Sequence, residues 1–571
     1  MAESPEISKA LIKYALLNAY AHGGRAESGA IVGKVIAEFP NLKSQAKNLF
    51  HAARVMIDEI NSLSIAQQIS RLENEFPKEF ANMHEKRDEK KQLPPLEDAT
   101  RGKVVTRFPP EPNGYPHIGH AKAALIGYKY AKMYDGKFIL RFDDTNPIAE
   151  RIEYYDALTS GLEWLGIKPD IIKNTSDDID QIYRLAKKMI ESGHLYICEC
   201  ERSRIKANRA KGKNCDHRDT EQRILLEKWE MLFSEYREHE AVVRFKGNMM
   251  DLNTALRDPT MMRIIDHPHP LTGEKYRVWP TYDLASPIED SIDGVTHAMR
   301  SKEYELRDPL YYLILDILGI HKPHLIEFSR LEMRDTPVSK RVFRPLIEEG
   351  KVEGWNDPRL PTLIGLRRRG FTPDAVKEFI DGLGVGKSES EPTWDLLESI
   401  NRKLIDPITR RYFFVPVPVL LHVDKAPQLS VKLKHHPEKD LGERVIVTGN
   451  TFFITRSDAE QLRKGDSIRL MDLFNVTITE IGETLSGEYD GKDMRAGIKK
   501  IQWVPENSIP FIVKIPRALF KDGEYNENSL ETFEGIAEPA CISLKKDEYI
   551  QFARFGFCKV DGLQIAIMTH K

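Results

Sequence analysis

Two histidines three residues apart, His117 and His120, lie in the segment RFPPEPNGYPHIGHAKAAL at residues 107–125. Its prolines keep the first part extended, and Gly119 lets the backbone approach a ligand closely. The helical pattern that follows places both imidazoles at a helix N-terminus, where the potential favours anions. The segment therefore predicts a phosphate site in which two imidazoles stabilise charge on a leaving group. The alternatives are a Gly/Pro loop with incidental histidines, or a metal pair.

A second cluster combines thiols with an imidazole. Cys198 and Cys200 are followed after fourteen residues by Cys215 and His217. Four such ligands suffice for a closed tetrahedral zinc site, which predicts a structural Zn²⁺. Buried or free thiols beside a surface histidine are the alternative.

Strand, loop, helix and strand alternate around the histidines. Residues 104–108 (VVTRF) and 136–144 (GKFILRFDD) predict strands on either side of a helix over 119–134. This βαβ unit implies a parallel sheet with ligands at the carboxyl ends of its strands. The second strand ends in Asp143 and Asp144. Ending a buried strand with two acids is costly without a nearby cation, which favours a site there.

The regions before and after this βαβ unit differ in their residue patterns. Helical periodicity covers residues 10–23, 30–40 and 47–63, a charged linker is predicted at 84–98, and residues 310–405 are mainly helical. After residue 406, β-branched and aromatic runs separated by turn signals predict one or two antiparallel β-barrels. The fold class is multidomain α/β plus β, with an N-terminal helical domain.

Length, charge and cysteine content limit the classes of protein to which the chain can belong. The chain has 571 residues with 84 Lys and Arg against 87 Asp and Glu, so its net charge of −3 gives no evidence for nucleic-acid binding and does not exclude it. We find no signal-peptide pattern and no apolar run of membrane-spanning length. Five scattered cysteines favour a reducing compartment. We expect a cytoplasmic protein, a monomer, with no membrane partner.

The segment around HIGH, residues 117–120, resembles the signature of class I aminoacyl-tRNA synthetases, and its surroundings resemble the glutamyl/glutaminyl branch. This resemblance implies ATP with Mg²⁺ as a substrate and a Rossmann-like catalytic domain. The second family signature, KMSKS, matches residues 338–341, although its first lysine is absent and Pro337 precedes the core. The implied catalytic residues are His117, His120 and Lys340, and the implied ATP-binding residues are these three with Gly119, Ser339 and Arg341.

The same resemblance implies the amino-acid site. Asp143 matches the carboxylate that holds the α-ammonium, and Arg107 and Tyr282 match further positions around the amino acid. Arg300 aligns with the position facing the end of the side chain, where arginine is typical of glutamyl enzymes and a small uncharged residue of glutaminyl enzymes. A guanidinium pairs with a γ-carboxylate through two hydrogen bonds. Contact with tRNA phosphate or a surface acid is the alternative for Arg300.

The helical region and the barrels resemble tRNA-binding parts of the family. Arg367, Arg368 and Arg369 suit tRNA phosphates, or form a solvated basic turn. The barrels resemble the anticodon-binding barrels of glutaminyl and archaeal/eukaryotic glutamyl enzymes. The expected domains are an N-terminal helical domain with its linker (1–98), a catalytic domain in two halves (101–195 and 276–345), an acceptor-end-binding insertion with the zinc site (196–275), a helical connecting domain (346–405) and anticodon-binding barrels (406–571).

The function implied is ATP-dependent joining of L-glutamate to tRNA(Glu), with tRNA(Gln) as a further candidate partner. The alternatives are a glutaminyl enzyme, a catalytically inactive tRNA-binding scaffold and a tRNA-modifying glutamyl transferase. Members of the last group lack the C-terminal barrels that are expected here.

Overall fold

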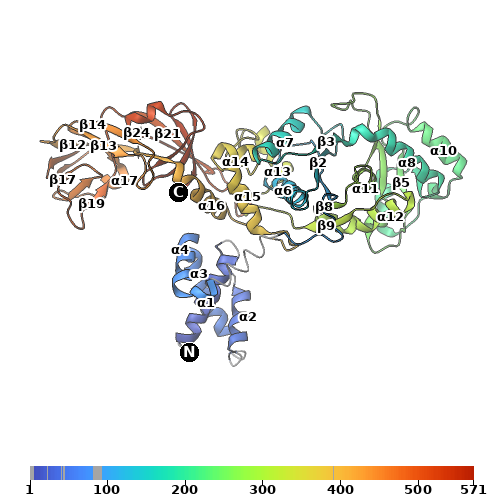
Figure 1. Ribbon diagram of the computed structural model, residues 1–571, viewed down its shortest axis with the longest axis horizontal. Helices are drawn as coiled ribbons and strands as arrows, with labels where there is room; N and C mark the ends of the chain where they lie inside the picture. The colour runs from blue at the N-terminus through green and yellow to red at the C-terminus, as the bar shows by residue number, and fades with distance from the viewer. Residues whose placement is uncertain are drawn as a thin grey trace. The chain divides into compact units, whose positions relative to one another are not determined.

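The computed structural model describes residues 5–21, 24–26, 28–39, 42, 46–80, 93–389 and 391–571 (Figure 1). The chain forms two compact units, and each is described by itself. One contains Met1–His84, Met333–Phe379 and Pro392–Lys571; the other contains Glu85–Glu332 and Ile380–Glu391. None of the helices in the described ranges has both the length and the apolar character needed to cross a lipid bilayer.

The N-terminal helices pack around a core of their own, centred on apolar residues such as Leu11, Leu16 and Val35. A capping box begins the last of them: Ser64 Oγ accepts from Gln67 N, and Gln67 Oε1 accepts from Ser64 N. These helices confirm the predicted helical character of the described part of this region, and most of the predicted linker, residues 84–92, lies outside the described residues. The helices are α1 Pro5–Ala21, α2 Ser28–Glu38, α3 Ala46–Ser62 and α4 Ile65–Glu75.

The predicted βαβ unit is confirmed. Strands β1 Val105–Phe108, β2 Lys137–Phe142 and β3 Ile171–Asn174 form a parallel sheet. Helix α6 Ile118–Met133 connects the first two strands, and α7 Ile152–Trp164 connects β2 to β3. Parallel pairing places the carboxyl ends of all three strands at one edge.

A second parallel pair, a sheet of its own, lies beside β1. Strands β8 His297–Ser301 and β9 His324–Phe328 pair in parallel. Thr296 N donates to Val105 O at 2.9 Å and Arg107 Nη1 reaches Met299 O, so β8 runs in the direction of β1. Helix α11 Tyr282–Ile292 precedes β8, and α12 Asp308–Leu318 connects β8 to β9. Both helices supply side chains to the sheet edge described below.

The inserted region, expected from the sequence as an acceptor-end-binding insertion with a zinc site, is built on an antiparallel sheet that the sequence did not predict. Its four strands pair in chain order and end at Pro280, five residues beyond the predicted limit of 275. The elements are β4 Leu195–Cys198, β5 Val242–Phe245, β6 Thr260–Ile264, β7 Val278–Pro280, α8 Ile179–Glu191, α9 Arg202–Lys211 and α10 Gln222–Met231.

The prediction that residues 310–405 are mainly helical is also confirmed, and the strand β9 lies within this region. Besides α12, it contains α13 Lys340–Glu348, α14 Leu363–Arg369, α15 Pro373–Leu383 and α16 Trp394–Ile405.

The C-terminal region contains two seven-stranded sheets, each with its own core. In the first, β10 and β11 lie at opposite edges, yet only Phe413 separates them in the chain. Since one residue spans at most about 3.6 Å, the two edges must meet and the sheet curls into a near-barrel. Strands β19 and β20, separated by Gln502, close the second sheet in the same way. Each sheet also contains two parallel pairings, so the barrels are mostly rather than wholly antiparallel.

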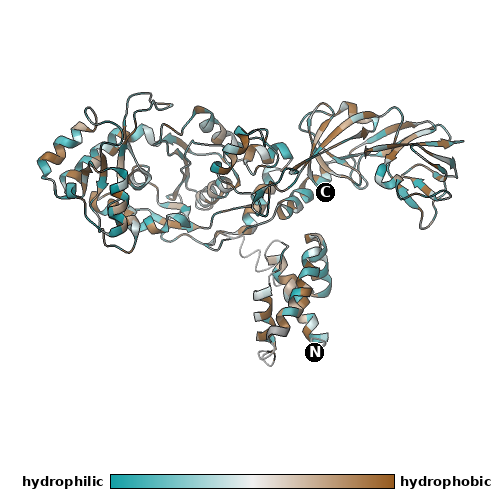
Figure 2. Cartoon of the chain, turned by 180° about the vertical axis from the view of Figure 1, so that it is seen from behind, coloured by the Kyte–Doolittle hydropathy of each residue, from teal (hydrophilic) through white to brown (hydrophobic). Residues whose placement is uncertain are grey.

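Buried and more exposed residues alternate along strands such as Pro418–Asp424 and Glu443–Thr448. Figure 2 shows that both hydrophobic and hydrophilic residues occur along the strands of this region. The first barrel contains β10 Arg410–Tyr412, β11 Phe414–Pro416, β21 Ile509–Pro516, β24 Leu530–Ala537, β25 Tyr549–Phe552, β26 Gly556–Gly562 and β27 Ile565–His570. The second contains β12 Pro418–Asp424, β15 Thr451–Thr455, β16 Ser467–Leu470, β17 Asn475–Ile481, β18 Leu485–Tyr489, β19 Lys499–Ile501 and β20 Trp503–Pro505. The remaining elements are β13 Leu429–Lys434, β14 Glu443–Thr448, α17 Arg456–Ala459, β22 Phe520–Lys521 and β23 Glu524–Tyr525.

Candidate active site

Arg107, on β1, is enclosed by protein. Its Nε and Nη2 donate to the two carboxylate oxygens of Asp290 on α11 at 2.9 and 3.0 Å, and its Nη1 donates to Met299 O at 2.5 Å. Both charged side chains are almost inaccessible to solvent. Arg107 is therefore one half of a buried ion pair, and its direct contact with an amino acid stays a prediction.

Arg141, near the end of β2, connects the same carboxylate to the predicted site. Its Nη1 lies 2.9 Å from Asp290 Oδ1, and its Nε donates to Asp143 Oδ1 at 3.1 Å. Burial raises the pKa of Asp143, although the charge of Arg141 opposes the rise. The Asp143 side chain keeps 14% of its surface exposed whereas that of Arg141 keeps none. Asp143 is therefore the member of this chain of contacts that solvent can reach, and its contact with an amino acid stays a prediction.

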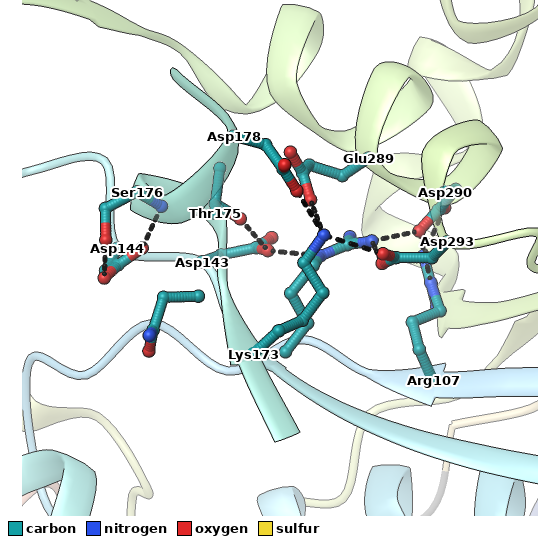
Figure 3. A network of polar contacts seen from close by, with 12 residues as sticks. Arg107, Asp143, Asp144, Lys173, Thr175, Ser176, Asp178, Glu289, Asp290 and Asp293 are labelled. Carbon is teal, nitrogen blue, oxygen red and sulfur yellow. Dashed lines mark hydrogen bonds and ion pairs between the residues drawn. The ribbon is translucent and has the colours of Figure 1, made fainter. Parts of the chain in front are cut away.

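Lys173, on β3, extends the network. Its Nζ lies 2.8 Å from Asp293 Oδ1 and 3.1 Å from Glu289 Oε2, and it also pairs with Asp178 (Figure 3). Burial raises the pKa of Glu289 to about 8, against the opposing charges of Arg141 and Lys173.

Negative charge is in excess in this network. The contacts join three cations to five carboxyl groups: Arg107, Arg141 and Lys173 with Asp143, Asp178, Glu289, Asp290 and Asp293. Because its raised pKa keeps Glu289 mostly protonated at pH 7, the other four carboxylates face the three cations. A further cation, such as an amine, is the ligand that this surplus favours.

Arg300, on β8, is buried, and some of its N–H groups make no hydrogen bond within the described residues. Its Nη2 donates to Asp308, and its guanidinium carbon lies 5.1 Å from the ring centre of Tyr311. Within the described part of the chain, its Nε and Nη1 are buried and have no acceptor. Leaving such donors unpaired is costly, so this position favours a ligand with acceptor oxygens. Tyr311 donates to Asp290 at 2.9 Å, which links Arg300 to the ion-pair network.

Tyr282 lies at the start of α11, the helix that supplies Asp290. Its ring centre is 4.6 Å from that of Tyr304. The structure thus places Arg107, Asp143 and Arg300 in one network, with Tyr282 on the same helix as Asp290.

His117 and His120 begin α6 as a capping pair. His117 Nδ1 accepts from Gly119 N at 3.1 Å, and His120 Nδ1 accepts from His117 N at 3.2 Å. Burial, His120 and Arg330 together lower the pKa of His117 well below its ordinary value, so this imidazole is neutral at pH 7. With Nδ1 accepting, each neutral ring carries its proton on Nε2 and can donate it to a phosphate oxygen.

Ser339, Lys340 and Arg341 begin α13. Ser339 Oγ caps the helix by accepting from Arg341 N at 3.3 Å, and Lys340 is the first helical residue. Trp394 Nε1 donates to Thr336 Oγ1 at 3.0 Å, which braces the segment before the cap. These residues lie in the unit with Met333–Phe379, and their contact with ATP stays a prediction.

The three arginines of α14 differ in their surroundings. Arg368 pairs with Asp561 through two hydrogen bonds of 3.0 and 2.8 Å. Arg369 is buried and donates to Glu398 at 2.5 Å. Arg367 is exposed. Intramolecular pairing of two of the three weakens the case for phosphate contacts by Arg368 and Arg369, and Arg367 is the best placed.

The four predicted metal ligands come together. Their ligand atoms lie within 4.8 Å of one another. Cys215 Sγ is 3.6 Å from Cys198 Sγ and 3.4 Å from Cys200 Sγ, and His217 Nδ1 is 3.3 Å from Cys215 Sγ. A tetrahedral zinc ion with Zn–S bonds of about 2.3 Å separates its thiolates by about 3.8 Å, so the four residues fit this ion.

A cavity of about 340 Å³ opens in the first barrel. Aromatic rings of Phe533 and Phe555 and cationic Arg517 and Arg554 line it together with Gln551, whose Oε1 is buried and has no donor in the described part of the chain. The stacking surface and the unpaired acceptor suit an unpaired nucleobase, whereas the two arginines are already paired, Arg517 with Glu531 and Arg554 with Asp458.

A parallel sheet with the HIGH histidines after its first strand and an anticodon-type barrel region defines a class I aminoacyl-tRNA synthetase. The family model described as "tRNA synthetases class I (E and Q), catalytic domain" matches residues 103–407, and two models of the family's anti-codon binding domain match 409–491 and 500–561. The chain belongs to this family of class I E and Q tRNA synthetases. This confirms the predicted fold class.

Curated relatives match nearly the whole chain. Glutamate–tRNA ligase of Nitrosopumilus maritimus is 47% identical over 99% of this chain and 100% of its own length. The ligase of the same name from Cenarchaeum symbiosum is 46% identical over 98% of both chains, and that from Pyrococcus furiosus is 41% identical over 99% of this chain and 100% of its own.

Several residues of the site escaped the sequence analysis. Arg141 stands two residues before Asp143, inside an otherwise apolar strand. A buried arginine needs an acidic partner, so this position could have indicated a buried ion pair. Asp290 lies in the last turn of α11 and Asp293 is the C-cap of that helix, three residues later, but nothing in their sequence indicates which strands they meet. Gln551 gave no signal at all.

The raised pKa of Glu289 predicts a pH-dependent stability. Because its folded value of about 8 exceeds the ordinary 4.5, the free energy of unfolding falls as pH rises between these values, by about 1.4 kcal/mol per pH unit. Glu289→Gln mimics the protonated form and should lose this dependence. Urea unfolding at about pH 5 to 8 measures it, with exposed Glu227→Gln as the control. Parallel pH profiles of wild type and Glu289→Gln would refute the prediction.

Proposed function

We propose that this chain is a glutamate–tRNA ligase, which activates L-glutamate with ATP and transfers it to the 3′-terminal adenosine of tRNA(Glu). The observation that carries the proposal is Arg300, a buried guanidinium with two donors that lack acceptors in the described residues. The names of the curated relatives support the same substrate.

Glutamate binds between two opposite charges. Its α-ammonium pairs with Asp143, at the edge of a network that carries surplus negative charge. Its γ-carboxylate accepts hydrogen bonds from Arg300. A carboxamide would offer this guanidinium a single neutral acceptor oxygen and direct its own donors toward a cation, so glutamine is disfavoured.

Adenylate formation requires positioning and charge stabilisation. The α-carboxylate of glutamate attacks the α-phosphorus of MgATP, and pyrophosphate leaves. Neutral His117 and His120 donate Nε2–H groups to phosphate oxygens at the N-terminus of α6, where the helix dipole adds positive potential. Lys340 neutralises charge on the β- and γ-phosphates as they depart. No covalent intermediate with the protein is needed.

In the second step a hydroxyl of the terminal adenosine, the 2′-hydroxyl in the family mechanism, attacks the carbonyl carbon of the adenylate. The bond to AMP breaks, the proton of the hydroxyl passes to the departing phosphate, and AMP leaves. Recognition of tRNA extends to the other unit, where exposed Arg367 meets a phosphate and the cavity around Gln551 receives an unpaired base. A base imino or amino group then donates to Gln551 Oε1.

A structural zinc ion belongs to this proposal. Cys198, Cys200, Cys215 and His217 would hold it and stabilise the fold of the inserted region; no chemical step passes through it. Charging of tRNA(Gln), the monomeric state and the cytoplasmic location stay predictions. A catalytically inactive tRNA-binding scaffold is the competing function, and failure to form glutamyl adenylate with tRNA present would favour it.

Arg300→Met tests the substrate. Loss of the guanidinium removes the partner of the γ-carboxylate, at a cost of about 2 to 4 kcal/mol, or roughly one to three decades in kcat/KM for glutamate. ATP–pyrophosphate exchange in the presence of tRNA(Glu) measures it with glutamate and with glutamine. Arg223→Met, at an exposed arginine of α10, is the matched control. Preference of the wild type for glutamine, or full glutamate activity in Arg300→Met, would overturn the assignment.

Gln551→Ala tests the barrel cavity. Removing the acceptor should lower kcat/KM for tRNA(Glu) by about tenfold, close to 1.4 kcal/mol, because the base loses one hydrogen bond. The KM for ATP should stay unchanged. Aminoacylation over a range of tRNA concentrations measures the effect, and Gln461→Ala, exposed in the second barrel, serves as the control. Unaltered kinetics toward tRNA would exclude the cavity as a base-binding site.

A further inference from the structure

Glu199 lies between the two cysteines of the first pair and faces the histidine of the second. Its Oε2 is 3.3 Å from His217 Nε2. On the opposite side of the ring, His217 Nδ1 lies 3.3 Å from Cys215 Sγ and 3.5 Å from Cys200 Sγ. The imidazole therefore presents Nδ1 to the thiols and Nε2 to the carboxylate.

The carboxylate is fixed independently of the cysteines. Lys228 Nζ, on α10, donates to Glu199 Oε2 at 2.5 Å, and Tyr236 donates its hydroxyl to Glu199 Oε1. These two donors leave Glu199 Oε2 directed toward the ring. A carboxylate held in this way accepts only from a ring nitrogen that carries a proton, which selects the tautomer with hydrogen on Nε2.

Arg244 adds a second contact from outside the ligand set. Its Nη1 donates to Cys198 Sγ at 3.8 Å, while its Nε and Nη2 donate to Asp258 O at 3.0 and 2.8 Å. Three thiolates around one Zn²⁺ carry a net negative charge, and this buried cation offsets it. A carboxylate thus contacts the imidazole and a guanidinium contacts a thiol, as expected for residues that surround the ligands of a metal ion.

We propose that Glu199 is the positioning residue of this metal centre: by accepting the Nε2 proton of His217, it directs the Nδ1 lone pair toward the three thiolates. The role rests on the proposed zinc ion and is independent of which amino acid the enzyme activates. Carboxylates that orient ligating histidines raise metal affinity, and their loss costs about 10- to 100-fold.

The test is the zinc affinity of the full-length chain, measured by competition with a chromophoric chelator. Glu199→Ala should bind zinc about 10- to 100-fold more weakly than wild type. Glu201→Ala, at the exposed glutamate directly after Cys200, is the matched control and should bind like wild type. Equal affinities of Glu199→Ala and wild type would overturn the role of Glu199.

A second measurement needs no variant. In zinc-loaded wild type labelled with ¹⁵N-histidine, NMR should show His217 coordinated through Nδ1 and protonated on Nε2. Coordination through Nε2 would overturn the inference even if zinc binds tightly. A wild type that binds no zinc would refute the metal centre and Glu199's role together, whereas glutamate charging by the same preparation tests the ligase function separately.

Discussion

The carboxylate of Asp290 is the contact on which the arrangement of the active site depends. It is fully buried between two guanidiniums and a tyrosine hydroxyl. Burial alone would raise its pKa, but the two arginines hold it below the ordinary value. Removing one partner of such a pair costs about 3 to 5 kcal/mol, because an unpaired charge stays buried. Strands β1 and β2 and helices α11 and α12 are therefore held in one relative position.

Asp290 connects the two ends of the proposed amino-acid site through ion pairs and hydrogen bonds. Arg141 carries the connection to Asp143, and Tyr311 carries it to the face of Arg300. Surplus carboxylates surround the first end, whereas the second end is a cation with unused donors. An amino acid with an ammonium at one end and a carboxylate at the other complements both, and no single interaction has to provide all of the discrimination.

The sequence predicted what depends on local pattern. The βαβ unit, the helical regions and the approach of Cys198 to His217 follow from periodicity and short spacings. It could not predict partners that the fold brings from far away: Asp290 is 183 residues from Arg107, and Asp561 is 193 residues from Arg368. For that reason the run Arg367–Arg369 suggested phosphate contacts, although two of these arginines are paired with acids inside the protein. The inserted sheet escaped because β4 and β5 pair across 43 intervening residues.

The same physical feature underlies the two proposed recognition sites, which are far apart in the chain. Arg300 Nε and Nη1 are buried donors, and Gln551 Oε1 is a buried acceptor, and none has a partner in the described residues. Folding removes water from such atoms, so their lost hydrogen bonds destabilise the unliganded protein unless a ligand restores them. A ligand that restores them gains specificity, since an analogue lacking the matching group leaves the cost in place. Discrimination among amino acids and among tRNAs can thus rest on one principle, applied to a carboxylate on the catalytic sheet and to a base in the barrel.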